Sequence, residues 1–303
     1  MSRKRKKLDV SLLPFERSDL YGLSPYDNQF SGWEINKFHI PEKWKESKGE
    51  DVVVAVIDTG CDYNHLDIKD NILSGISFVD KKDCMDDNGH GTHVCSTIAA
   101  TDNAIGMVGV APRAKIIPVK ALDAKGQGNL KSLVEAILWA SNSIADIVTM
   151  SLGSSSFSKE IQDAINYGHN NGKIFFCAAG NSGENQDILY PAACKNTIAI
   201  GAIDSDLKRT VFTCAGEELD FLCPGQDILG CVPNNNYAIM SGTSMANPFA
   251  VGCAALYISK LKKRNITASL DDIINVFKQS AKDIDEPKYR SKKYQGYGIL
   301  YPV

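Results

Sequence analysis

Apolar residues fall into two kinds of run along this chain. Short, nearly continuous apolar runs have the length of buried strands, and between them stand segments whose apolar residues recur every three to four positions, as in helices. The strand-like runs are residues 52–57, 115–122, 146–152, 173–179 and 197–202, and the helix-like segments are residues 94–100, 130–141 and 158–170. Strands that alternate with helices form βαβ units, so we predict an α/β fold with a doubly wound, mostly parallel sheet and helices on both faces.

Small residues lead into one further apolar segment near the C-terminus. Residues 241–248 read Ser-Gly-Thr-Ser-Met-Ala-Asn-Pro and precede the helix-length apolar run 249–257. We expect Ser244 in the first turn of this helix, where backbone N–H groups are unpaired and can stabilise an anion. Pro248 fits an opening turn, because there its missing N–H leaves no carbonyl without a partner. Taken alone, a serine at this place is more often a helix cap than a nucleophile.

Two polar positions elsewhere favour a catalytic interpretation. Asp58 ends the apolar run 52–57, which places a carboxylate at the carboxyl end of a buried parallel strand, where sites form in open α/β sheets. His90 stands between two glycines at the start of a helical pattern, and we expect its imidazole to be accessible. An acid, an imidazole and a hydroxyl are the parts of an activated nucleophile: the histidine takes the hydroxyl proton and the acid orients the ring.

Four sequence blocks, in this order, resemble those of the subtilisin-family (subtilase) serine proteases, and the chain is most similar to the intracellular subtilisins. The blocks are Asp58-Thr59-Gly60, His90-Gly91-Thr92-His93, Ala178-Ala179-Gly180-Asn181-Ser182-Gly183 and Gly242-Thr243-Ser244-Met245-Ala246. The resemblance covers roughly residues 33–303 and implies a subtilisin-like serine endopeptidase that works through an acyl-enzyme. It assigns Asp58, His90 and Ser244 to the triad and Asn181 to the oxyanion hole, and subtilisin is itself the reference case for these roles.

The resemblance also implies a cleft for an extended polypeptide substrate. Glycines in such a cleft let a peptide pair with the enzyme as an added strand. Two residues depart from the family pattern: Ser154 stands where a second glycine is usual, and Leu189 intrudes on the main side-chain pocket. We therefore expect a preference for medium-sized apolar residues before the cleaved bond. The residues implied for the cleft are Gly126, Gly128, Leu130, Ser151, Leu152, Gly153, Ser154, Gly180 and Leu189.

Calcium is the cofactor that the resemblance implies. Asp67 matches the family's carboxylate ligand, and Asn103 lies in a loop that adds an amide and backbone carbonyls. Oxygen ligands with few charges suit a hard cation that is bound for stability and takes no part in catalysis. A plain surface loop is the alternative. The expected ligands are Gln29, Asp67, Thr101, Asn103, Ile105 and Met107.

Residues 1–32 are polar and irregular apart from one apolar cluster at residues 11–15. Read without any relative, such a segment is a disordered terminus. The intracellular subtilisins, however, carry an N-terminal extension with a Leu-Ile-Pro-Tyr/Phe motif that lies across the active site and keeps the precursor inactive, and Leu12-Leu13-Pro14-Phe15 resembles it. Proline presets an extended backbone and lacks an N–H, so such a segment can be held as a poorly cleaved peptide. The resemblance thus implies a self-inhibitory extension, residues 1–32, before a peptidase domain at residues 33–303.

Charge and composition limit the classes of partner that the protein can be expected to bind. The net charge is −3, so nothing beyond the basic run at residues 3–7 points to nucleic acid, and that run is most simply a solvated terminus. No apolar signal-peptide core follows it, and no stretch approaches the roughly 18 apolar residues of a membrane span. Nine cysteines, an odd number, stand mostly within apolar patterns, which favours reduced thiols in the cytoplasm over a disulfide framework. We expect no nucleic-acid or membrane partner, and a homodimer is left open.

Two other functions fit the same residues. A dedicated processing protease would use the same chemistry on one leader peptide or one zymogen, and a panel of unrelated proteins would distinguish it from a degradative enzyme. A catalytically silent subtilase fold could serve as a binding module. The complete Asp, His and Ser set argues against the silent fold.

Overall fold

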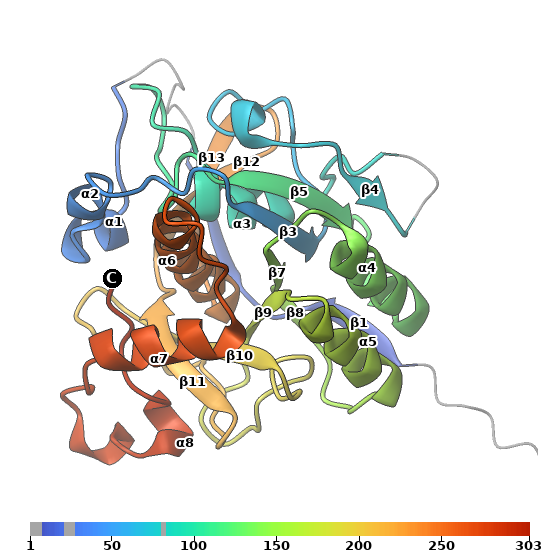
Figure 1. The fold of residues 1–303 in the computed structure, drawn as a ribbon. Coiled ribbons are helices and arrows are strands. Elements are labelled where there is room, and N and C mark those ends of the chain that lie inside the picture. The colour runs from blue at the N-terminus through green and yellow to red at the C-terminus, as the bar shows by residue number, and fades with distance from the viewer. Residues whose placement is uncertain (1–7, 21–27, 80–82) are drawn as a thin grey trace, which may run out of the picture.

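A seven-stranded sheet, with every neighbouring pair of strands parallel, forms the centre of the structure, a computed structural model that describes residues 8–20, 28–79 and 83–303 (Figure 1). Its order is β11 (Leu219–Pro224), β10 (Thr197–Ile203), β9 (Ile174–Ala178), β7 (Ile147–Met150), β3 (Val53–Asp58), β5 (Lys115–Lys120) and β4 (Ile76–Ser77). Each of the five predicted apolar runs forms one of these strands. The α/β fold with a parallel sheet is therefore confirmed.

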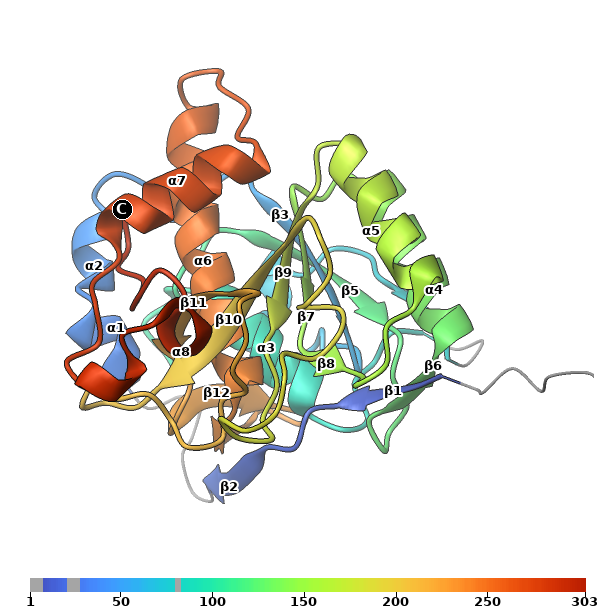
Figure 2. The same ribbon diagram turned by 90° about the horizontal axis from the view of Figure 1, so that it is seen from below.

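Helices cover both faces of this sheet, as predicted (Figure 2). One face carries α3 (His90–Ala99), α6 (Thr243–Lys262) and α7 (Leu270–Ser280), and the other carries α4 (Leu130–Asn142) and α5 (Lys159–Asn170). The sequence marks several of the starts: side chains of Asn129, Ser158 and Ser269 accept hydrogen bonds from the first turns of α4, α5 and α7. Such caps satisfy N–H groups that have no partner within the helix.

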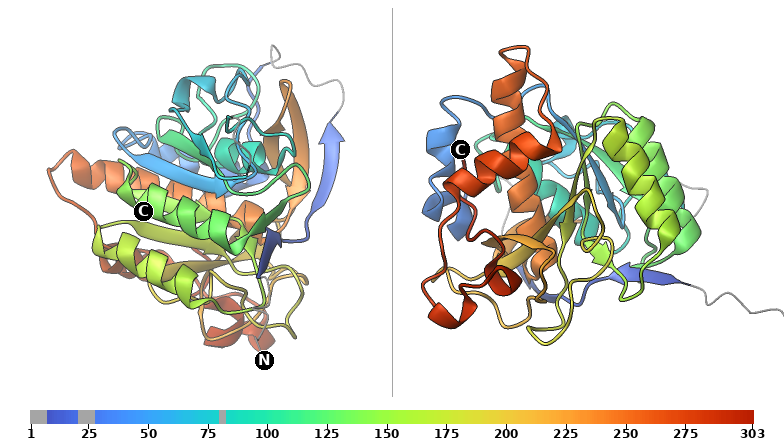
Figure 3. Two further views of the ribbon diagram at one scale, coloured as in Figure 1. Left: turned by 90° about the vertical axis from the view of Figure 1, so that its right-hand side faces the viewer. Right: turned by 60° about the horizontal axis from the view of Figure 1, so that its bottom comes forward.

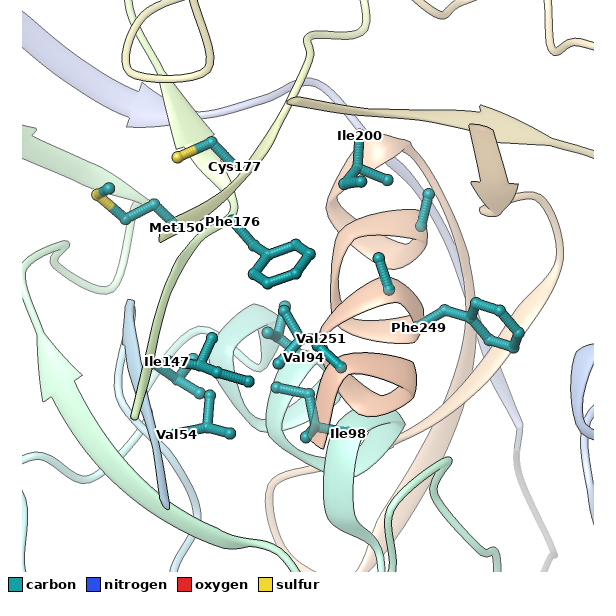
Figure 4. Close-up of a cluster of buried hydrophobic side chains, with 14 of the residues drawn as sticks. Val54, Val94, Ile98, Ile147, Met150, Phe176, Cys177, Ile200, Phe249 and Val251 are labelled. Carbon is teal, nitrogen blue, oxygen red and sulfur yellow. The ribbon is translucent and has the colours of Figure 1, made fainter. Parts of the chain in front are cut away.

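The main core lies between the sheet and the helix pair α3 and α6 (Figure 4). Inward-facing side chains of neighbouring strands meet side chains of both helices there, all of them shielded from solvent. Because α6 is surrounded by protein, its N-terminal turn is held firmly against the edge of the sheet. The labelled members of this cluster are Val54, Val94, Ile98, Ile147, Met150, Phe176, Cys177, Ile200, Phe249 and Val251.

Two small antiparallel sheets lie beside the main one, and each includes a strand from the N-terminal segment. The first joins β1 (Asp9–Leu12) to β6 (Gln127–Asn129) and β8 (Leu152–Gly153). The second joins β2 (Glu16–Leu20) to β13 (Asn236–Ser241), which pairs with β12 (Ile228–Val232) (Figure 3). Most of residues 8–20 therefore form strands that pair with the rest of the protein, and the interpretation as a disordered terminus is wrong for them. Residues 1–7, which contain the basic run, lie outside the described residues.

Two details of the helices differ from expectation. Helix α3 begins at His90, four residues before the apolar pattern, because Gly89 takes a left-handed backbone conformation (φ 104°) and turns the chain directly into the helix. Pro248 lies inside α6, beyond its opening turn, so the prediction that it stands in the opening turn is wrong. The remaining short helices are α1 (Trp33–Lys37), α2 (Ile40–Lys43), α8 (Lys292–Gln295) and the 3-10 turns Lys69–Asn71 and Pro287–Tyr289.

All nine cysteines are buried, and all are free thiols. This agrees with the expectation that they pack as small apolar side chains. Among the described residues, no helix combines the length and the apolar character needed to cross a membrane.

Candidate active site

The carboxyl edge of the central sheet brings the three proposed catalytic residues to one region. Asp58 is the last residue of β3, which lies between β5 and β7 in the middle of the sheet. His90 is the first residue of α3, and Ser244 is the second residue of α6, so the expected first-turn position of the serine is confirmed. Helices α3 and α6 pack against each other on one face of the sheet. The edge is the one at which open α/β sheets form their sites.

Asp58 and His90 form a buried hydrogen-bonded pair. Nδ1 of His90 lies 2.8 Å from Oδ1 of Asp58, and both side chains have no exposed surface. A carboxylate can only accept, so Nδ1 carries the proton and Nε2 of the neutral ring is left as an acceptor. The backbone N–H of Thr59 donates to the same Oδ1 at 2.8 Å. The aspartate is thereby fixed in place, and it fixes the tautomer of the histidine.

The hydroxyl of Ser244 has a different partner in this structure. Its Oγ donates to the backbone oxygen of Ser151 at 3.3 Å, and Nε2 of His90 has no hydrogen-bond partner among the described residues. The structure thus joins the acid to the imidazole and turns the serine hydroxyl to another acceptor. The hydroxyl must leave this acceptor before it can donate to the imidazole, and such bonds often tighten only when substrate binds.

The side-chain amide of Asn181 is held in one orientation. Its oxygen accepts hydrogen bonds from the backbone N–H of Thr243 at 2.9 Å and from the Thr243 hydroxyl at 2.7 Å. Its Nδ2 must therefore face the other way, where it donates to the backbone oxygen of Pro14 at 2.6 Å. Thr243, which the sequence reasoning passed over, is the residue that aims this donor.

Residues 9–15 lie across this edge of the sheet as an extended chain. In β1, Val10 is paired with Gly128 and Ser11 with Gly153, and the N–H of Leu12 donates to Gly126 at 2.9 Å. The segment thus forms the middle strand between the two stretches that were predicted to line a peptide cleft. Three residues further on, the ring of Phe15 lies 5.0 Å from the imidazole of His90, centroid to centroid.

Leu13 is buried against residues that were assigned to the cleft. It is 2 % exposed, and a methyl group built on Gly153 would lie 2.9 Å from Leu13 and 3.2 Å from Leu189. A methyl group built on Gly180 would also lie 3.0 Å from Leu189. Ser154 is bonded through its backbone to Tyr190, the residue after Leu189. Of the other residues assigned to the cleft, Leu152 is in β8 and Leu130 begins α4, where it is half-buried.

Two expectations about this region need correction. The imidazole of His90 was expected to be accessible and has no exposed surface, because α3 and the core enclose it and Phe15 packs on it. The second concerns the acidic run at residues 80–87, whose sequence alone predicts a surface loop. Of these, 80–82 lie outside the described residues, but Asp86 is buried and accepts hydrogen bonds from the Thr59 hydroxyl and from the backbone of residues 88, 89 and 92.

Asp86 therefore ties the end of the Asp58 strand to the start of the His90 helix. Beside it, the buried ammonium of Lys120 bonds to Asp87 and to the backbone oxygen of Thr59, each at 2.6 Å. The sequence signal for this role of Asp86 was the run Asp-Asp-Asn-Gly directly before the histidine. Aspartate carboxylates in such runs often accept hydrogen bonds from the backbone N–H groups that follow and so close a turn.

The six residues expected to bind calcium also come together. Nε2 of Gln29 lies 2.9 Å from the backbone oxygen of Thr101, and the oxygens of Asn103, Ile105 and Met107 surround the same atom at 3.3 to 3.5 Å. Asp67 is fully buried; its Oδ2 accepts from the Met107 N–H, while its Oδ1 has no partner among the described residues. Burial raises the pKa of Asp67. Several carbonyl oxygens and an unpaired carboxylate oxygen are the donor set of a hard cation, so the residues fit calcium.

Comparison with known proteins shows the family to which the chain belongs. Residues 49–298 match the subtilase family. The chain is 37% identical over 276 residues to the "Intracellular serine protease" of Paenibacillus polymyxa, covering 88% of this chain and 84% of that one. It is 38% identical over 278 residues to the "Major intracellular serine protease" of Bacillus subtilis, covering 88% and 86%.

A third relative is longer than this chain. The "Thermophilic serine proteinase" of Bacillus sp. strain AK1 is 39% identical over 242 residues, which are 78% of this chain and 60% of that one. The family match and the two intracellular relatives cover most of the chain. This protein belongs to the subtilase family of serine proteases.

Proposed function

We propose that this serine protease is an endopeptidase that cleaves extended polypeptides with Ser244 as nucleophile, His90 as general base and acid, and Asp58 as the group that orients the ring. After the serine side chain turns, Nε2 takes the hydroxyl proton as Oγ attacks the peptide carbonyl. The Asn181 amide and the backbone N–H of Ser244 bind the oxyanion. The imidazolium then protonates the leaving amine, and water hydrolyses the acyl-enzyme by the same route.

The observation that carries this proposal is the hydrogen bond from Asn181 Nδ2 to the Pro14 oxygen. A donor that is already aimed at a peptide carbonyl suits catalysis, because it costs no reorganisation when charge develops on the oxygen. The pairing of β1 with both walls of the cleft supports an extended substrate, bound through its backbone with side chains in pockets.

We further propose that the protein is made as a self-inhibited precursor in the cytoplasm. Leu13 fills the side-chain pocket, yet the carbonyl at the oxyanion donor is that of Pro14, one residue later. The bond after Leu13 is thus out of line with the donor, and Pro14 supplies no N–H to correct it. The cytoplasmic location is supported by the nine free thiols and by the two relatives named as intracellular.

Calcium is proposed as a structural cofactor, held by the oxygens of residues 101–107 and by Asp67. If the Gln29 amide is turned over, its oxygen replaces Nε2 among these acceptors and becomes a further ligand. The ion would supply no chemistry to the reaction; it would hold the segment around residue 29 against the loop.

The test compares the full chain with a form that lacks residues 1–20, each with and without Ser244→Ala. We expect the trimmed protein to hydrolyse casein at least about tenfold faster than the full chain and to react with a fluorophosphonate, while both Ser244→Ala forms do neither. Mass spectrometry records any self-cleavage. Equal activity of the two lengths would refute the self-inhibition, and substantial hydrolysis by the Ser244→Ala form would refute the triad. Cleavage of only one of many unrelated proteins would favour a dedicated processing enzyme.

A further inference from the structure

Strand β13 binds a second part of the N-terminal segment, apart from the sheet that contains β1 (Figure 3). Five residues of β2 pair with it in antiparallel register, from Glu16 opposite Ser241 to Leu20 opposite Tyr237. β13 leads directly into the Gly242 turn and the nucleophile helix. The backbone edge of β13 is therefore a peptide-binding edge that begins next to Ser244 and runs away from it.

Arg17 makes the polar contacts of this second segment. In a strand, alternate side chains share a face, and Arg17 and Asp19 are on one face together, with Nε of Arg17 2.6 Å from Oδ1 of Asp19. Nη1 of Arg17 donates to the backbone oxygen of Asn88 at 3.2 Å. A methyl group built on Gly89 would lie 2.9 Å from the same Nη1, so the guanidinium lies close against the backbone that precedes His90.

The face that carries Arg17 lines a cavity of 670 Å³ with acidic walls. Asp62, Asp86 and Asp87 are among its lining residues, together with the asparagines of the turn between β12 and β13. Both oxygens of Asp62 already accept backbone N–H groups, and those of Asp86 accept the Thr59 hydroxyl and backbone N–H groups, so these carboxylates act on a bound cation through their charge. Lys120 pairs with Asp87, which leaves an excess of negative charge. Among the described residues that line the cavity, Arg17 is the only cation. The cavity is thus suited to a guanidinium or ammonium group.

We propose that the edge of β13 binds the part of a polypeptide substrate that follows the cleaved bond, as an added strand, and that the acidic cavity selects an arginine or lysine three or four residues after that bond. Arg17 is the fourth residue after Leu13, which fills the side-chain pocket, and the third after Pro14, whose carbonyl meets Asn181. The inference rests on the proposed function, and it names the substrate class for the same site.

The β13 edge and the cavity contribute differently to the binding of a substrate. When β2 leaves, the unpaired N–H and C=O groups of β13 can bind any extended chain, so the edge supplies affinity without regard to sequence. The cavity supplies the choice of side chain. Because the side chain of Arg17 is 32 % exposed where it lies, solvent screens its charge, and the preference should be modest.

The experiment uses the form that lacks residues 1–20 and a set of internally quenched peptides with one common sequence before the bond. Arginine, citrulline or glutamate is placed in turn at each of the second to sixth positions after the bond. We expect kcat/KM to be about three- to fivefold higher for arginine than for citrulline, and lower still for glutamate, at the third or fourth position only. Peptides that end one residue after the bond should be cleaved more slowly than all of these.

Two variants locate the preference on the protein. Asp62→Asn, whose melting temperature is checked because Asp62 accepts backbone N–H groups of Asn64 and Asn234, should bring arginine and citrulline to equal rates. Asp163→Asn, an exposed change on α5, should leave the ratio unchanged. In the full chain, Arg17→Gln should loosen β2 and raise the residual activity. Equal rates for arginine, citrulline and glutamate at every position would overturn the inference, whereas a trimmed protein that cleaves no peptide would overturn the proposed function instead.

Discussion

A single missing N–H determines how the backbone around Ser244 is held. Pro248 cannot donate to the carbonyl of Ser244, which stands four residues earlier in α6. The hydroxyl of Ser151 replaces that donor and binds the Ser244 oxygen at 3.1 Å. The amide of Asn247 lies 3.3 Å from the same hydroxyl and holds it in turn. The backbone at Ser244 is thus held by side chains in place of the regular helical bond.

Removal of this hydroxyl should therefore destabilise the protein. In Ser151→Ala, the Ser244 carbonyl is buried without its donor, and we expect the free energy of unfolding to fall by about 1–3 kcal/mol. Denaturant unfolding in a Ser244→Ala background, which prevents self-digestion, measures the change. Ser156→Ala, at an exposed serine between β8 and α5, is the matched control. If both variants unfold alike, the Ser151 hydroxyl does not carry this role.

At this scale the sequence predicted which residues belong to the site better than it predicted their surroundings. Asp58 and His90 could be paired because motifs give residue types and order. The burial of His90 could not be foreseen, since it depends on Phe15, 75 positions away in the chain. The current partner of the Ser244 hydroxyl is likewise a matter of rotamer, and no motif encodes a rotamer.

The short helix α1 contains a carboxylate in an unfavourable place. Glu34 is 2 % exposed, and its Oε2 has no partner among the described residues. Burial raises the pKa of Glu34 to about 7. Since the folded protein then binds this proton more tightly than the unfolded chain, its contribution to stability is full below about pH 4.5 and is lost as the pH rises through about 7.

Neutralisation of Glu34 should remove this pH dependence. We expect Glu34→Gln to be more stable than the parent at pH 8, by up to about 3 kcal/mol, and close to it at pH 5. Urea unfolding at the two pH values, again with Ser244→Ala, provides the test. Glu42→Gln, an exposed glutamate in α2, should show no such difference. A Glu34→Gln protein that is equally destabilised at both pH values would contradict the explanation.

Among the elements, the strands of the main sheet were the most predictable. Residues 174–179 are apolar without interruption, and residues 198–202 are broken only by Gly201, because both faces of a parallel strand are covered. This pattern can be recognised without any knowledge of the fold. The strands β1 and β2 could not be predicted from their own residues. Their sequences, Asp-Val-Ser-Leu and Glu-Arg-Ser-Asp-Leu, are strands only because β6, β8 and β13 offer free edges to them.

At the scale of the molecule, the proposed calcium site joins distant parts of the chain. Gln29 follows the N-terminal segment, Asp67 lies between β3 and α3, and the carbonyl loop follows α3. The sequence could suggest these ligands only through resemblance, because backbone carbonyls leave no trace in residue identity. The converging oxygens are the physical reason to expect that an ion stabilises the whole arrangement.

Removal of calcium should lower the melting temperature of the Ser244→Ala protein. At calcium concentrations about a hundredfold above the dissociation constant, binding adds about 2.7 kcal/mol, which corresponds to a shift of about 5 °C. Differential scanning calorimetry with and without a chelator measures it. Asp67→Asn should abolish the shift, and magnesium should not restore it. An unchanged melting temperature after chelation would show that the loop holds no ion.

The covering segment is joined to the enzyme by its own backbone, and this has a consequence for kinetics. A tethered ligand acts at a local concentration on the order of millimolar, set by the connecting chain and independent of how much protein is present. Under the proposed self-inhibition, dilution alone would therefore leave the uncut chain inactive. A free peptide of residues 8–20, added to the trimmed enzyme, would inhibit it only at concentrations near the dissociation constant of the peptide. Cleavage of one backbone bond thus changes the binding of this segment from an intramolecular, first-order step to a bimolecular, second-order one.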